Sequence, residues 1–134
     1  MQSSVKALED ISALDATFAI AFLSFDTANR VRILEQPGLL AALVKLLDPS
    51  VTDTDSTFAD EHDLVVRFAL SAISQLALDR HARAALCKER NAVSFIFQRA
   101  LNESKEVYIR MTAMIALSNL FLETSVCECF LNDK

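Results

Sequence analysis

The sequence predicts an all-α fold built from a repeated unit. Of the 134 residues, 52% are hydrophobic, one is Gly and two are Pro, too few turn-forming residues for many tight hairpins. Small and large apolar residues also recur at the helical spacing i, i+3, i+4, i+7, and we expect these stripes to supply the core. The three copies are Ala16, Ala19, Ile20, Leu23; Ala69, Ala72, Ile73, Leu76; and Ala113, Ala116, Leu117, Leu120. Such recurrence indicates an internal repeat.

Two helices are predicted before the chain first breaks. The first covers residues 3–25, where a serine can cap its start. The second begins at Asp26 or Thr27 and stops at Pro37–Gly38. Proline disfavours the helical region for the residue before it, and glycine can take the left-handed conformation that ends a helix.

An acidic loop is predicted after the next helix. LLAALVKLLD forms a compact helix closed by Pro49, and residues 49–62 follow as the polar loop. The window from Asp48 to Asp63 holds six acidic residues and no Lys or Arg, against a net charge of -5 for the whole chain. The remainder is therefore near neutral, which argues against a duplex-binding protein.

The second half of the chain repeats the same order of helices. A long helix runs from His62 or Asp63 to about Asp79, and RHARAALCKER follows as a short one. Asn91 then stands where Gly38 stood, and Asn also tolerates a positive φ. VSFIFQRALN and a long helix capped by Ser104, which reaches about Glu123, complete the copy. The last predicted segment, 125–134, starts a further helix.

This order of helices resembles the armadillo repeat family. LLAALVKLL resembles the second helix of the family, ALSNL at 116–120 resembles the end of its third helix, and Gly38 sits at its glycine between first and second helices. HEAT repeats, with two helices per unit, are the alternative. The resemblance implies a right-handed α-solenoid of three-helix repeats forming a single domain over 1–134. Its parts are a terminal third helix 3–25, a repeat 26–79 with the acidic loop 49–62, a repeat 80–124, and the start of another at 125–134.

The resemblance also implies a concave groove lined by third helices, in which an Asn holds the backbone of an extended peptide. Asn119 occupies that position, and an amide suits the task because it both donates and accepts hydrogen bonds. Asn119 could equally satisfy backbone groups inside the stack. The chain has no Trp, so the basic-peptide recognition of the nuclear-import adaptors is not expected. The predicted partner-binding residues are Arg67, Ser71, Gln75, Met111, Ile115 and Asn119.

Both ends of the stack are expected to expose apolar surface, because the chain begins on a lone third helix and stops partway through a repeat. A longer solenoid or a partner protein would cover them. The apolar stripe of Leu14, Phe18 and Phe22 could either pack in the core or contact a partner. The expected end-face contacts are Leu14, Phe18, Phe22, Cys127 and Phe130.

No catalytic site, cofactor or metal site is expected. One glycine cannot make a phosphate-cradling loop, and neither His62 nor His81 lies in a nucleophile or metal motif. Asp53 and Asp55 begin like a calcium loop, but Phe58 stands where that loop requires glycine. The sequence therefore argues against an enzyme.

The cysteines and the first residues predict a cytoplasmic protein. Cys87, Cys127 and Cys129 are an odd number without C-x-x-C spacing, which favours reduced cysteines in the cytosol. MQSSVKALED lacks the apolar region of a secretory signal, and no apolar run approaches the roughly 20 residues of a membrane span. Nuclear or cytoskeletal and ciliary association stay open.

We expect a non-enzymatic scaffold or adaptor that binds a peptide or helix of another protein on the concave face. The alternative is a structural subunit of a larger multiprotein assembly, its solenoid ends buried by neighbours. The two interpretations differ in where the contacts lie, in the groove or at the ends, and the exposed ends also allow self-association.

Overall fold

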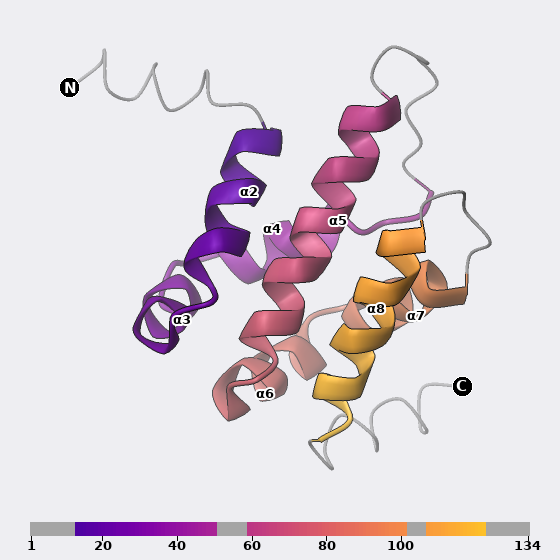
Figure 1. Cartoon of the computed structure of the whole chain (residues 1–134). Coiled ribbons are helices and arrows are strands. Elements are labelled where there is room, and N and C mark those ends of the chain that lie inside the picture. Colours follow the sequence, from indigo (N-terminus) through magenta and orange to yellow (C-terminus); the bar gives the residue numbers. More distant parts are fainter. Residues whose placement is uncertain (1–12, 51–58, 102–106, 123–134) are drawn as a thin grey trace.

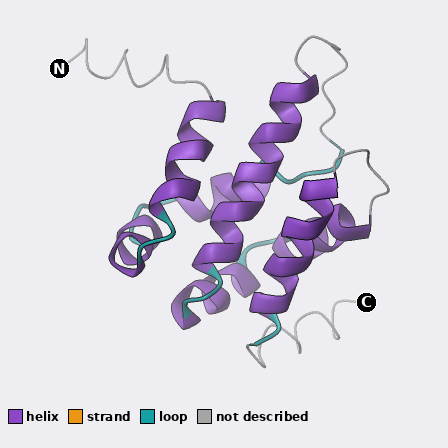
Figure 2. Ribbon diagram, in the orientation of Figure 1, coloured by secondary structure: helices purple, strands orange, loops and turns teal. Residues whose placement is uncertain are grey.

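The computed structural model describes residues 13–50, 59–101 and 107–122. Over these ranges the chain forms seven α-helices and no strand, so the prediction of an all-α chain is confirmed (Figure 2). The helices are α2 (Ala13–Leu23), α3 (Thr27–Leu34), α4 (Leu39–Lys45), α5 (Ala59–Leu76), α6 (Arg80–Lys88), α7 (Ala92–Leu101) and α8 (Val107–Leu120).

The long helices form one layer in which their order in space follows their order in the chain. Figure 1 shows α2, α5 and α8 side by side, and α5 in the middle packs against both neighbours. The shorter helices lie behind or at the lower end of this layer: α7 packs on α8, α4 contacts α5, and α3 and α6 connect the two levels. The layer has an inner side that meets the short helices and an outer side that does not.

The three long helices end at equivalent positions of the repeated apolar stripe. Their last residues are Leu23, Leu76 and Leu120, the final members of the three stripes. The predicted ends at Phe25, Asp79 and Glu123 are each two to three residues too late. Leu76 and Leu120 are fully buried, so α5 and α8 each end at a core position.

The turns after α2 and α5 share the same capping geometry. Asp26 is the N-cap of α3 and its Oδ1 accepts a hydrogen bond from the Ala28 backbone N–H at 2.9 Å. Asp79 is the N-cap of α6 and accepts from His81 in the same way at 2.8 Å. The two aspartates are 53 residues apart, the same offset as between the first two stripes. The internal repeat thus extends to the caps.

The side chain of the arginine four residues after each cap reaches back to the end of the preceding long helix. Arg30 Nε donates to the Ser24 carbonyl at 2.6 Å, and Arg83 donates to the Ala77 carbonyl at 2.9 Å. Carbonyls at a helix end have no partner within the helix, so a side-chain donor there satisfies them.

The predicted left-handed positions are confirmed. Gly38, the N-cap of α4, has φ 76°, and Asn91, directly before α7, has φ 69°. No other described residue has a positive φ. The turns at Gly38 and Asn91 lead into the short helices α4 and α7, which lie behind the layer. The two halves of the chain therefore use the same left-handed backbone conformation at equivalent turns.

The second and third stripes form the core as predicted, and all eight of their residues are buried. The first stripe does not. In α2 the buried residues are Thr17 and Ala21, followed by Ser24, whereas Ala19 is exposed and Leu23 is 46% exposed. Helix α2 packs on α5 along one side, and that contact, rather than its own apolar pattern, decides which side chains are covered.

The acidic loop is shorter than predicted. Helix α5 begins at Ala59, so the last residues of the predicted loop 49–62 are helical. Glu61 lies in the first turn of α5, where the helix dipole favours an acidic side chain. The predicted cap at Ser104, the start of the 3–25 helix, the segment 51–58 and the helix at 125–134 lie outside the described residues.

Candidate protein-binding face

A small groove opens on the outer side of the long-helix layer, where all three long helices meet. Its volume is about 270 Å³. The aromatic groove, as we call it, is lined by Phe18, Ala21, Phe22, Phe25, Arg67, Phe68, Ser71 and Thr112. Four of these eight side chains are phenylalanine rings, so the groove favours apolar groups.

The α2 and α5 walls of the groove are joined by an aromatic pair. The rings of Phe18 and Phe68 lie 5.1 Å apart between centroids and are inclined by 83°, an edge-to-face arrangement. Phe68 is half-buried and packs against the core. Phe22, one turn beyond Phe18, is 69% exposed. The groove therefore has a fixed floor and an exposed aromatic rim.

Arg67 is the one charged residue in the lining of the groove. Its guanidinium carbon lies 4.5 Å from the centroid of the Tyr108 ring, a cation–π contact that joins α5 to α8. The Arg67 side chain is half-buried, and within the described residues its guanidinium makes no ion pair or hydrogen bond. Its N–H donors at the edge of the guanidinium plane are thus available to a bound molecule.

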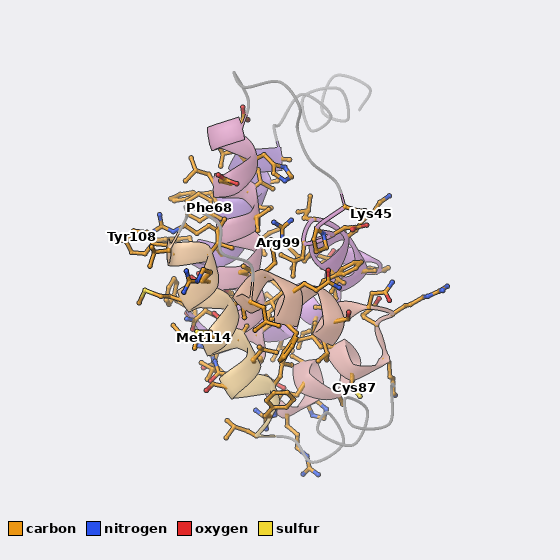
Figure 3. The ribbon with its side chains drawn as sticks, turned by 90° about the vertical axis from the view of Figure 1, so that its right-hand side faces the viewer. Lys45, Phe68, Cys87, Arg99, Tyr108 and Met114 are labelled. Carbon is orange, nitrogen blue, oxygen red and sulfur yellow. The ribbon has the colours of Figure 1, made fainter. Side chains whose placement is uncertain are left out.

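Exposed apolar side chains continue along α8 beside the groove. Met111 and Ile115 are 52% and 51% exposed, and Tyr108 and Met114 are exposed as well. Figure 3 shows Phe68, Tyr108 and Met114 on one side of the molecule and Lys45 on the opposite side. The groove and this α8 stripe together form the outer face of the layer.

The structure brings most predicted site residues to this outer face. Arg67 and Ser71 line the groove, and Gln75 is half-buried one turn beyond Ser71. Met111 and Ile115 are exposed on α8, one residue before and three residues after Thr112, which lines the groove. Two predicted end-face residues, Phe18 and Phe22, line the same groove, and Phe22 also lines a second hollow at the α2 end. Leu14 is half-buried, and Cys127 and Phe130 lie outside the described residues.

Asn119 joins two long helices. Its Nδ2 donates a hydrogen bond to the Ser74 carbonyl at 2.9 Å, across 45 residues of sequence. The Leu78 N–H, which would bond Ser74 in a continuing helix, instead donates to the Gln75 carbonyl. Asn119 thereby satisfies a carbonyl in the last turn of α5. Of the two roles expected for Asn119, peptide recognition and the satisfaction of backbone groups inside the stack, this bond is the second.

Arg99 performs a similar task between the two short helices α4 and α7, a role that no sequence pattern indicated. The side chain is only 9% exposed, and it donates from Nε to the Leu47 carbonyl at 3.0 Å and from a terminal nitrogen to the Asp48 carbonyl at 3.2 Å. Burial lowers the pKa of Arg99, and the nearby carboxylates of Asp63 and Asp48 oppose that shift. An arginine at the end of an apolar helix would ordinarily be assigned to solvent, so only its contacts reveal this role.

Asp48 closes α4 through its own turn. Its Oδ1 accepts hydrogen bonds from the Ser50 hydroxyl at 2.7 Å and from the Ser50 backbone N–H at 2.9 Å. These two bonds, with a smaller contribution from the charge of Arg99, hold the pKa of the Asp48 carboxyl below its usual value.

A second and larger hollow lies at the α2 end of the layer. It has a volume of about 670 Å³ and is lined by Phe22, Leu23, Phe25, Asp26, Thr27 and Asn29. Leu23 and Val31, on α2 and α3, are each 46% exposed. The hollow shares Phe22 and Phe25 with the aromatic groove, so the outer face and this end surface are continuous.

The prediction of reduced cysteines is wrong for Cys87, which is disulfide-bonded. Cys127 and Cys129 lie outside the described residues. Disulfides are rare in cytosolic proteins, so the cysteines no longer support the cytoplasmic location, which stays a prediction.

The described ranges contain no group of three or more His, Cys, Asp or Glu side chains that could hold a metal ion. No helix in those ranges has the length and apolar character needed to cross a membrane. Comparison with protein-family models, curated proteins and solved structures found no match.

Proposed function

We propose that this chain is an armadillo-like α-solenoid segment that acts as a non-enzymatic scaffold, binding a helix or extended peptide of another protein on the outer face of α2, α5 and α8. Three features support the solenoid. The long helices stack in chain order, they end at equivalent leucines, and the turns after α2 and α5 carry the same Asp cap and returning Arg.

The observation that carries the binding function is the aromatic groove together with the exposed Met111 and Ile115, which lie on α8 within three residues of the groove residue Thr112. Contiguous exposed apolar patches commonly mark interaction sites, whereas single exposed apolar residues are ordinary. The Asn119–Ser74 hydrogen bond and the Arg67–Tyr108 contact hold α5 and α8 in a fixed relation. A partner would therefore meet a preformed surface.

The test uses a displayed library of random 16-residue peptides, selected on the whole folded chain. Peptides that bind the outer face should bind at least about fivefold more weakly to a Met111→Ser, Ile115→Ser double variant, because apolar contact area is lost. Leu101→Ser is the matched control: Leu101 is exposed on α7, outside this face. Both variants should keep the wild-type helical circular dichroism. Selected peptides that bind the double variant as well as the wild type would contradict the proposal.

The second candidate function, an assembly subunit with buried ends, is favoured by the hollow at the α2 end, which the exposed Leu23 lines, and by the exposed Val31 on α3. In that case the purified chain should associate with rising concentration in light scattering. A Leu23→Ser, Val31→Ser double variant should shift this association to at least about fivefold higher concentration and retain a cooperative melt. A wild-type chain that stays monomeric at all concentrations would count against this candidate.

A further inference from the structure

The aromatic groove has the size of a side-chain pocket. Its volume of about 270 Å³ lies just below the roughly 300 Å³ at which pockets for small molecules begin. It therefore suits one or two bulky side chains of a partner rather than a whole cofactor. The Phe18, Phe22 and Phe68 rings favour aromatic or large aliphatic groups in that position.

The positive charge at the groove favours a partner with a negatively charged group. None of the lining residues from α2, α5 or α8 is acidic, and Arg67 contributes the positive charge. Tyr108 covers its guanidinium carbon at 4.5 Å, while its donors carry no ion pair or hydrogen bond from the described residues. A planar guanidinium held in this way is suited to a carboxylate, which can accept two parallel N–H bonds. Because Arg67 is half-buried, salt screens such a pair less than a fully exposed one.

We propose that the aromatic groove binds an acidic–apolar segment of another protein, which inserts an aromatic or large aliphatic side chain between the phenylalanines and pairs an Asp or Glu with Arg67. On a helical partner the two residues would stand three or four positions apart, on one face. This inference rests on the proposed function and names the partner chemistry for that face.

The same peptide library tests this inference. The selected pool should be enriched in sequences that combine an aromatic or Leu residue with Asp or Glu three or four positions away. Arg67→Gln should weaken their binding about fivefold, and Phe22→Ser by at least as much. Arg110→Gln is the matched control, since Arg110 is an exposed arginine of α8 outside the groove lining and should change binding little. Raising the salt concentration from about 0.05 M to about 0.5 M should weaken wild-type binding more than binding to Arg67→Gln.

The outcomes separate this inference from the proposed function. Two results would contradict an acidic partner but not the proposed scaffold function. In the first, the selected peptides bind the Met111→Ser, Ile115→Ser variant more weakly than the wild type but bind Arg67→Gln equally well. In the second, the selected peptides are enriched in Lys and Arg. Peptides whose binding is weakened by none of the outer-face variants, or a library that yields no binder, would contradict both this inference and the proposed function.

Discussion

In the described part of the chain, the C-terminal ends of α2, α4 and α5 are closed by side chains from outside each helix. Two arginines that follow the caps return to the ends of α2 and α5, Arg99 reaches the end of α4, and Asn119 reaches the end of α5. The last carbonyls of a helix need such partners when they are removed from water. Arg99 and Asn119 act across 52 and 45 residues of sequence, so they also link the first half of the chain to the second.

At this scale we predict that Asn119→Ala lowers the free energy of unfolding by about 1 kcal/mol, because the Ser74 carbonyl loses its donor. Urea denaturation followed by circular dichroism measures the change. Gln98→Ala is the control: its amide bonds only the Ser94 hydroxyl on an exposed surface, and its removal should change stability by less than about 0.5 kcal/mol. Equal stabilities for Asn119→Ala and wild type would show that the bond contributes nothing.

At the scale of elements, the turns that start α4 and α7 depend on one left-handed residue each. Gly38 adopts φ 76° without conformational cost, and Asn91 adopts φ 69° as one of the few other residues that tolerate it. A Cβ added at Gly38 would meet no atom within 4 Å. Any penalty for a side chain there must therefore come from the backbone conformation and not from crowding.

We accordingly predict that Gly38→Ala lowers the free energy of unfolding by about 1 kcal/mol and that Gly38→Asn lowers it by less. The urea midpoints of the three proteins give the comparison. Asn91→Gly is the complementary variant and should be nearly neutral or slightly stabilising, since glycine takes the same φ more easily. If Gly38→Ala were as stable as wild type, the turn would have another backbone conformation available.

At the scale of the whole molecule, the layer of α2, α5 and α8 buries one side against the short helices and leaves the other exposed. The core occupies the inner side, where the second and third stripes are fully covered. The outer side holds the aromatic groove and the α8 stripe. The fold therefore separates the buried apolar surface that stabilises it from the exposed apolar surface of the outer face.

The disulfide at Cys87 is a further property of the whole molecule and can be checked chemically. In the unreduced protein, Cys87 should resist alkylation by iodoacetamide even in denaturant, and it should be labelled completely after reduction. Mass spectrometry of the tryptic peptide that spans residues 84–88 gives the reading. Full labelling before reduction would restore the reduced cysteine expected from the sequence.

The sequence by itself determined the features that depend on near neighbours. Helix periodicity, the start of a helix at Asp26 or Thr27 and the left-handed positions at Gly38 and Asn91 are decided within a few residues, so their patterns could be recognised directly. The burial of the second and third stripes also followed from spacing, because those helices have neighbours that cover the predicted side.

Only the tertiary structure decided the features that depend on distant residues. The orientation of α2 about its own axis, which leaves Leu23 exposed, follows from its packing on α5. The Asn119 amide bonds a carbonyl 45 residues away. The aromatic groove exists because Phe18 and Phe22 are brought against Arg67 and Ser71. Residue spacing within one helix carries no information about which neighbour its side chains will meet, and these contacts therefore could not be predicted from the pattern alone.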